Sequence, residues 1–128
     1  MPTHLHAPAA VGDVLDRISI LDIKLARVGA GREHVARERA ALVGAWNAAG
    51  LPSHEGVPEF PGLGAVNLAL WEVEDRLRAC EARGDFGPGF VADARLVYQA
   101  NDRRAALKRA VNLRFDSALV EVKEHPRY

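Results

Sequence analysis

The residues best suited to chemistry form one polar line in the last third of the chain. Asn101, Arg104, Lys108 and Asn112 recur at spacings of three or four residues, so a helix would present all four side chains on one face. If this face is buried, its two cations need anionic partners, supplied either by the protein itself or by a ligand. If it points outward, the same residues form a solvated surface, and the spacing is compatible with both interpretations.

Polar residues in two earlier segments could complete a protected site. Lys24 flanks the apolar positions of the first segment with Asp16 nearby, and Asn67 and Glu74 flank those of the third segment. In such a site the cations would hold an anionic small molecule, the amides would orient it, and Glu74 would be the candidate catalytic acid or base. The candidate ligand-binding residues are Asp16, Lys24, Asn67, Asn101, Arg104 and Lys108.

Two carboxylate pairs form a separate candidate site for a metal ion. Asp13 and Asp16, and likewise Glu72 and Asp75, place their oxygens one helical turn apart. Facing pairs of this kind can hold Mg²⁺ or Mn²⁺ inside a helical bundle. The pattern is similar to the paired acidic residues of the all-alpha nucleotide pyrophosphohydrolases, and that resemblance implies a metal-dependent hydrolase. The fuller acidic pattern of those enzymes is absent, and Asp13 is also placed to form a weak surface ion pair with Arg17.

The spacing of apolar residues predicts the elements that would position these side chains. Apolar residues recur every three or four positions over 11–28 and again over 63–80, which is typical of helices with one buried stripe. Further helices are predicted over 32–49 and 88–114, the latter with Pro88 in its first turn. Residues 50–62 contain three prolines and three glycines, which indicates a long loop. We therefore expect an all-α fold, a bundle of four main helices.

Length and charge narrow the remaining possibilities. The 128 residues fit a single domain, with a flexible N-terminus over 1–10 and an extended, docked tail over 117–128. Lys and Arg number 17 and so do Asp and Glu, so nucleic acid is an unlikely partner for a chain without net charge. Residues 95–114 nevertheless contain six cations and one acid, so the remainder of the chain must be acidic. A helix that spans a bilayer needs about 18 consecutive apolar residues, and no apolar run in this sequence is close to that length. We therefore expect a cytoplasmic location.

Two isoleucines suggest that the first helix contacts a partner molecule. Ile20 and Ile23 lie roughly opposite the main apolar stripe of that helix. A helix that is apolar on two sides is usually central in its fold or shared between subunits. We therefore expect a homo-oligomer, with the long loop or the tail as the alternative cover for these side chains.

Several stretches resemble a small uncharacterised bacterial family, a domain of unknown function of about this length. The resemblance rests on 12–18, 20–25 and 66–75, and above all on 97–109, with the sequence Val-Tyr-Gln-Ala-Asn-Asp-Arg-Arg-Ala-Ala-Leu-Lys-Arg. That family usually closes with an acidic-lysine-serine-tyrosine element and a final tyrosine, of which residues 121–128 keep only part. The resemblance spans most of the chain except 29–62. It implies a helical fold and a setting in cell-envelope glycan chemistry, and it implies no particular activity.

A looser similarity connects the first helix with the opening helix of the helical chorismate mutases. Those enzymes hold a dianionic substrate with cations from several helices, and Arg17, Lys24 and Arg104 could act in this way, although their order and spacing differ from the family's. Three functional hypotheses follow from the sequence: a self-associating interaction or adaptor module, a pocket or small enzyme for an anionic metabolite, and a metal-dependent hydrolase. The sequence contains no Gly-rich phosphate loop and no Cys-x-x-Cys pair, so it leaves the cofactor unknown.

Overall fold

Four α-helices account for most of the chain in a computed structural model that describes residues 2–128. They are α1 (Val11–Arg27), α2 (Arg32–Ala48), α3 (Phe60–Arg83) and α4 (Pro88–Arg114), and a short 3-10 turn, η1 (His54–Gly56), precedes α3. No strand occurs among the described residues. The predicted all-α fold with four main helices is confirmed.

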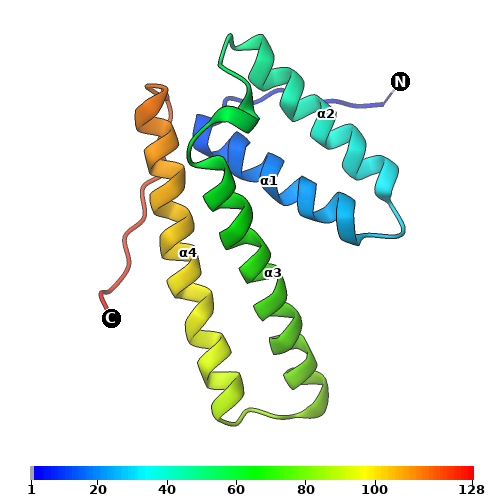
Figure 1. Cartoon of the computed structure of the whole chain (residues 1–128), viewed down its shortest axis with the longest axis vertical. Coiled ribbons are helices and arrows are strands. Elements are labelled where there is room, and N and C mark those ends of the chain that lie inside the picture. Colours follow the sequence, from blue (N-terminus) through cyan, green and yellow to red (C-terminus); the bar gives the residue numbers. More distant parts are fainter. Residues whose placement is uncertain (1) are drawn as a thin grey trace.

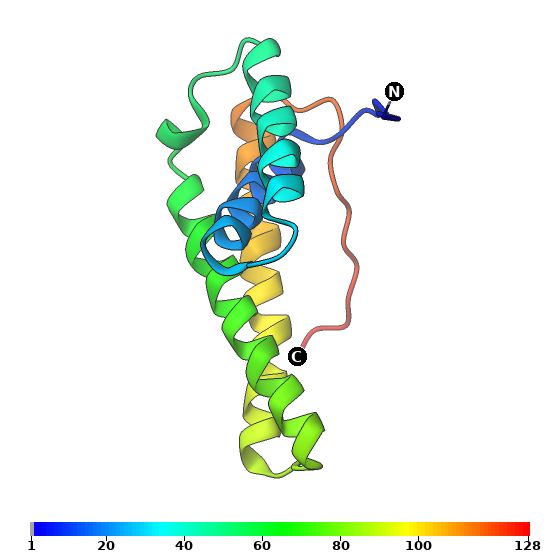
Figure 2. The ribbon, with the colours of Figure 1, turned by 90° about the vertical axis from the view of Figure 1, so that its right-hand side faces the viewer.

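The helix α1 lies at the centre of the arrangement. Helices α3 and α4 form a long antiparallel hairpin, and α1 crosses the upper half of this hairpin with α2 beside it (Figure 1). Each of the other three helices packs against α1, whereas α2 packs on the rest of the fold mainly through α1. The lower end of the hairpin projects past α1 and α2, as the second view also shows (Figure 2). The apolar stripe of α1 is therefore shared among three neighbours within the chain.

The core lies where α1 meets the other helices. Leu15, Leu63 and Val111, from α1, α3 and α4, have no exposed surface and belong to one cluster. Trp46 of α2 joins this cluster, and its indole N–H donates to the carbonyl of Pro52 at 2.7 Å. Each fully buried aliphatic side chain of this kind contributes about 1.5–3 kcal/mol to stability. The core thus fixes the angle at which α1 crosses the hairpin.

The start of α3 differs from the sequence-based prediction. The helix begins at Phe60, inside the segment 50–62 that was predicted to be a loop. Pro61 is tolerated there because the first turn of a helix has N–H groups without helical partners, so a proline removes no hydrogen bond. At its other end α3 stops at Gly84, whose φ of 66° lies in the left-handed region that favours glycine.

The C-terminal tail runs back beside α4 without regular secondary structure (Figures 1 and 2). Glu121 accepts a hydrogen bond from Lys108, and the phenol of Tyr128 donates one to Asp102, so the tail is fastened to α4 at two points. Residues 2–9 are exposed and also lack regular structure. None of the helices in the described part of the chain is both long and apolar enough to cross a membrane.

Candidate functional site

A buried carboxylate forms the centre of the polar network between α1 and α4. Asp16 of α1 is only 2% exposed, and Arg104 of α4 binds both of its oxygens. The distances are 2.9 Å from Nε to Oδ1 and 2.5 Å from the terminal nitrogen to Oδ2. A guanidinium and a carboxylate match in this forked geometry, which makes the pair strong and directional. The hydrogen bonds to Asp16 raise the pKa of Arg104, so the guanidinium stays charged.

Helix α3 joins the same network through Asn67, which is also buried. Its side-chain nitrogen donates to Oδ1 of Asp16 and to the hydroxyl of Ser19, each at 2.9 Å. The Ser19 hydroxyl in turn donates to the backbone carbonyl of Asp16 at 2.7 Å. Because every member has a partner, the network is stabilising rather than a source of unsatisfied buried groups. The network thereby fixes the positions of α1, α3 and α4 relative to one another.

Lys108 makes a second connection one turn further along α4. Its ammonium nitrogen lies 3.0 Å from Oδ1 of Asp13 and 2.8 Å from Oε2 of Glu121, and its side chain is 13% exposed. Burial lowers the pKa of Lys108, but the two carboxylates outweigh that effect and the net change is upward. The hydrogen bond from Lys108 also lowers the pKa of Glu121. This lysine therefore joins α1 and the tail to α4.

The start of α1 is capped by other parts of the chain. The N–H of Gly12 donates to Oδ1 of Asn112 at 2.7 Å, and the N–H of Val11 donates to the hydroxyl of Ser117 at 3.1 Å. These are among the first N–H groups of a helix, which have no partners within the helix itself. A Cβ on Gly12 would lie 2.4 Å from the carbonyl oxygen of Lys108, so only glycine fits this crossing. Helices α1 and α4 are in close contact here.

The polar line of α4 thus faces α1, and its cations are bound by carboxylates of the same chain. Arg104 contacts Asp16, and Lys108 contacts Asp13 and Glu121. A bound anion could use these two cations only by displacing carboxylates that are already in place. The excess positive charge of α4 is therefore partly balanced by internal pairing, and the expected pair of Asp13 with Arg17 is wrong, because Arg17 pairs with Glu38 on α2.

The remaining predicted ligand and catalytic residues do not share one pocket. Glu74 lines a pocket of about 350 Å³ between α3 and α4, together with Arg78 and Phe90. Asn101 lines a different groove, between α4 and the tail. Lys24 is half-buried on α1 and forms no ion pair with another residue of 2–128. The structure therefore brings Asp16, Asn67 and Arg104 into one network, holds Lys108 in a separate contact with Asp13 and Glu121, and leaves the other three predicted residues apart.

The four candidate metal ligands are also separated. Asp13 and Asp16 are paired with Lys108 and Arg104, and Glu72 lies 3.3 Å from Arg27. Within residues 2–128, no three His, Cys, Asp or Glu side chains lie close enough together to bind one metal ion. The two carboxylate pairs do not come together across the bundle.

Two open grooves remain, and the sequence did not point to either as a whole. One, of about 390 Å³, separates the second half of α1 from the first half of α3 and is mostly apolar. The other, of about 980 Å³, lies between α4 and the tail and is lined by basic and aromatic residues. The basic and aromatic residues at 123, 125, 127 and 128 were the feature of the sequence that could have indicated the second groove.

No family model, curated protein or solved structure matches this chain. Its function must therefore be argued from its own geometry.

Proposed function

We propose that this chain is a self-associating interaction module, and that two copies meet at the apolar groove between α1 and α3. The observation that carries the proposal is the character of this groove, which is open to solvent yet has an apolar lining. Apolar contributors come from both helices and are Ile23, Ala26, Phe60, Pro61 and Leu68. Apolar surface of this kind is stabilised when a partner removes it from water.

The charges at the edge of the groove favour its being covered. Asp22 and Arg27 line the groove, but Asp22 is already paired with Arg39 of α2, and Arg27 with Glu72 of α3. Burying an unpaired charge opposes association strongly, whereas a charge that keeps its partner costs much less. A partner could therefore cover the apolar lining without isolating either charge.

The partner that we propose is a second copy of this chain. Most homodimers have twofold symmetry, in which the same surface patch is used by both copies. Leu68 is 36% exposed on α3 at the groove and could enter the groove of the other copy. Ile23, one of the two isoleucines that suggested a shared helix, would be covered in the same interface.

A non-catalytic role is supported by the state of the candidate chemical groups. Asp16, Arg104 and Lys108, three of the candidate ligand-binding residues, are bound to one another or to other residues of the chain. Their contacts join three helices and the tail, which is a structural role. A setting beside cell-envelope glycan chemistry belongs to the same proposal and rests only on the family resemblance, and a cytoplasmic location is proposed with it.

The test measures the mass of the protein in solution against its concentration, by sedimentation or light scattering. The informative variant is Leu68→Lys, because it places a charge in the groove, where Glu72 one turn along α3 is already paired with Arg27. The matched control is Leu113→Lys on α4, since Leu113 is 75% exposed and outside the groove.

We expect a dimer that becomes a monomer in Leu68→Lys and persists in Leu113→Lys. A wild-type protein that stays monomeric at every concentration would refute self-association. A dimer that both variants leave intact would show that the groove is not the interface.

A further inference from the structure

We infer that the groove between α4 and the C-terminal tail is a binding site for a phosphate-bearing small molecule. This site is separate from the α1–α3 groove and does not depend on self-association. It has a volume of about 980 Å³, which is ample for a phosphorylated metabolite. Its walls are the middle of α4 on one side and residues 123–128 on the other.

The first argument is the charge of the lining. Arg109 comes from α4, and Lys123 and Arg127 come from the tail, so three permanent cations point to the same groove from two segments. The one carboxylate in the lining, Asp102, already accepts a hydrogen bond from the phenol of Tyr128. Lys123 lies 3.5 Å from Glu121, whereas Arg109 and Arg127 could bind an anion without displacing a carboxylate.

The second argument compares Arg109 with Arg104, Lys108 and Arg114, the three cations of α4 that have ion-pair partners within residues 2–128. Arg104, Lys108 and Arg114 each have a carboxylate partner, at 2.5 Å, 2.8 Å and 2.7 Å. Arg109 forms no ion pair within residues 2–128, and neither does Arg127 on the facing tail. Within residues 2–128, Arg95 and Arg103 of α4 also form no ion pair, but they do not line this groove, where the guanidinium groups of Arg109 and Arg127 remain available.

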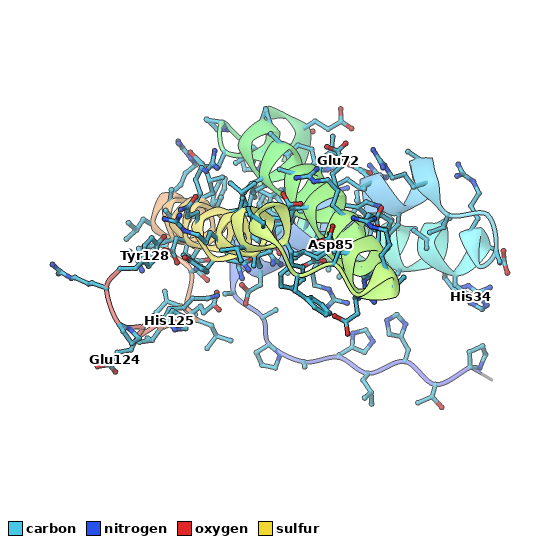
Figure 3. All side chains as sticks on the ribbon, turned by 90° about the horizontal axis from the view of Figure 1, so that it is seen from below. His34, Glu72, Asp85, Glu124, His125 and Tyr128 are labelled. Carbon is cyan, nitrogen blue, oxygen red and sulfur yellow. The ribbon has the colours of Figure 1, made fainter. Side chains whose placement is uncertain are left out.

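The third argument is the way in which the tail is held. The contact of Lys108 with Glu121 lies at one end of this segment, and the hydrogen bond from Tyr128 to Asp102 lies at the other. Figure 3 shows Tyr128 beside α4, with Glu124 on the outer edge of the tail. The segment between the two attachments is therefore positioned across the groove, and the acidic side chain of Glu124 points away from it.

The chemistry of the lining selects phosphate. Guanidinium groups bind phosphate oxygens through paired N–H donors, and two of them on opposite walls can contact more than one oxygen. Tyr98 is 42% exposed and lies edge-on to Tyr128, with ring centroids 4.8 Å apart, so it offers an aromatic face to a sugar or base. The side-chain amide of Asn101 can donate and accept hydrogen bonds beside it. A ligand that combines a ring with a phosphate or diphosphate uses all of these groups.

The test is a titration of the ¹⁵N-labelled full chain, followed by NMR amide shifts at near-physiological salt. The probes are inorganic pyrophosphate, glucose 1-phosphate and a nucleoside diphosphate, and citrate provides a carboxylate anion of similar charge. The diagnostic variant is Arg109→Ala combined with Arg127→Ala. The matched control is Arg103→Ala, because Arg103 is exposed on the same helix, forms no ion pair within residues 2–128 and does not line the groove.

We expect at least one phosphate probe to shift the amides of 98–109 and 123–128 together, and citrate to bind more weakly. The double variant should bind about tenfold more weakly or worse, as expected when charge-assisted hydrogen bonds are lost, and Arg103→Ala should bind as the wild type does. The arginines replaced in these variants are all exposed, so their thermal unfolding temperatures should equal that of the wild type. A lower unfolding temperature would reveal a variant that folds poorly. The proposed contact between Tyr98 and a sugar or base is tested by comparing the probes. Glucose 1-phosphate and the nucleoside diphosphate should bind more tightly than pyrophosphate, which has no ring.

Three results would overturn the inference: no shift with any phosphate probe, equal weakening by Arg103→Ala, or binding of citrate as tight as that of every phosphate. Because none of these residues lines the α1–α3 groove, Leu68→Lys should leave phosphate binding intact. The failure of one proposal is therefore distinguishable from the failure of the other.

Discussion

Replacing Arg104 by leucine should cost this protein a large part of its stability. The substitution keeps apolar packing at that position but removes the guanidinium that binds both oxygens of Asp16. Asp16 is 2% exposed, so its charge cannot turn to water without opening the contact between α1 and α4. Of the side chains in residues 2–128, only Asn67 would still donate a hydrogen bond to the buried carboxylate.

The expected loss in the free energy of unfolding comes from the buried carboxylate of Asp16, which remains without its guanidinium partner. Removing one partner of a buried ion pair typically costs about 3–5 kcal/mol, because the other charge stays buried without compensation. The Arg104 side chain is 29% exposed, so water already reaches part of this pair and the lower end of that range applies. A loss of about 3 kcal/mol is a large fraction of the ~5–15 kcal/mol that usually stabilises a domain. In urea it corresponds to a shift of about 2 M in the midpoint, for a slope of roughly 1.5 kcal/mol per molar.

Urea unfolding followed by helical circular dichroism measures this loss directly. A double-mutant cycle with Asp16→Asn separates the ion pair from the packing, since Asp16→Asn combined with Arg104→Leu leaves neither charge behind. We expect the double variant to be more stable than Arg104→Leu alone, by about 2 kcal/mol, because no unpaired charge is buried in it. Arg103→Leu is the control on the same helix and should change stability by less than about 0.5 kcal/mol.

Two results would refute this reasoning. A loss below about 1 kcal/mol for Arg104→Leu would place the pair among weakly contributing surface ion pairs. A double variant no more stable than Arg104→Leu would show that packing, rather than an uncompensated carboxylate, sets the loss.

Three further outcomes are expected from other contacts. Gly12→Ala should destabilise the folded protein by about 1–3 kcal/mol in thermal unfolding, because the new Cβ would meet the Lys108 carbonyl. The control Gly44→Ala should stabilise it by about 0.5–1 kcal/mol, because nothing lies within 4 Å of that Cβ. Equal effects of the two variants would contradict the close contact of α1 with α4. Asn112→Ala should cost about 1–3 kcal/mol by urea unfolding, because the buried N–H of Gly12 loses its acceptor, and a neutral effect would show that this N–H has another partner. The pKa of Glu121 is lowered in the folded state by Lys108, so its contribution is present above the unfolded value near 4.5 and is lost as the pH falls through the lower folded value. Acidification to that range should release the tail, as seen in the NMR relaxation of 121–128, and Glu121→Gln should release it already at neutral pH.

Much of the fold could be predicted from local patterns. The apolar spacing gave four helices, and α4 has the predicted bounds, Pro88–Arg114, because Gly87 and Pro88 suit a helix start. The prediction is wrong at the start of α3, because Pro61, one of the three prolines that indicate a loop over 50–62, lies in the first turn of the helix. Proline is compatible with that one position, and the packing of Phe60 against the core decides between the two states.

The site was predictable only in part. The spacing of Arg104 and Lys108 showed that they share a face, but not what that face meets. Their partners Asp16 and Glu121 are 88 and 13 residues away in the chain, and no local pattern encodes such distances. The capping of α1 by Asn112, 100 residues further on, was missed for the same reason.

Local sequence thus accounts for the helices: they form where apolar residues recur at helical spacing, and α1, α2 and α3 end close to a glycine. Which charges are satisfied depends on how the helices pack, because the pairing of Asp16 with Arg104 requires α1 to cross α4 at the position that Gly12 permits. Within residues 2–128, Arg109 forms no ion pair, whereas Lys108, one residue earlier, contacts two carboxylates. Helical periodicity turns adjacent residues about 100° apart, so the neighbouring cation faces the tail instead of α1.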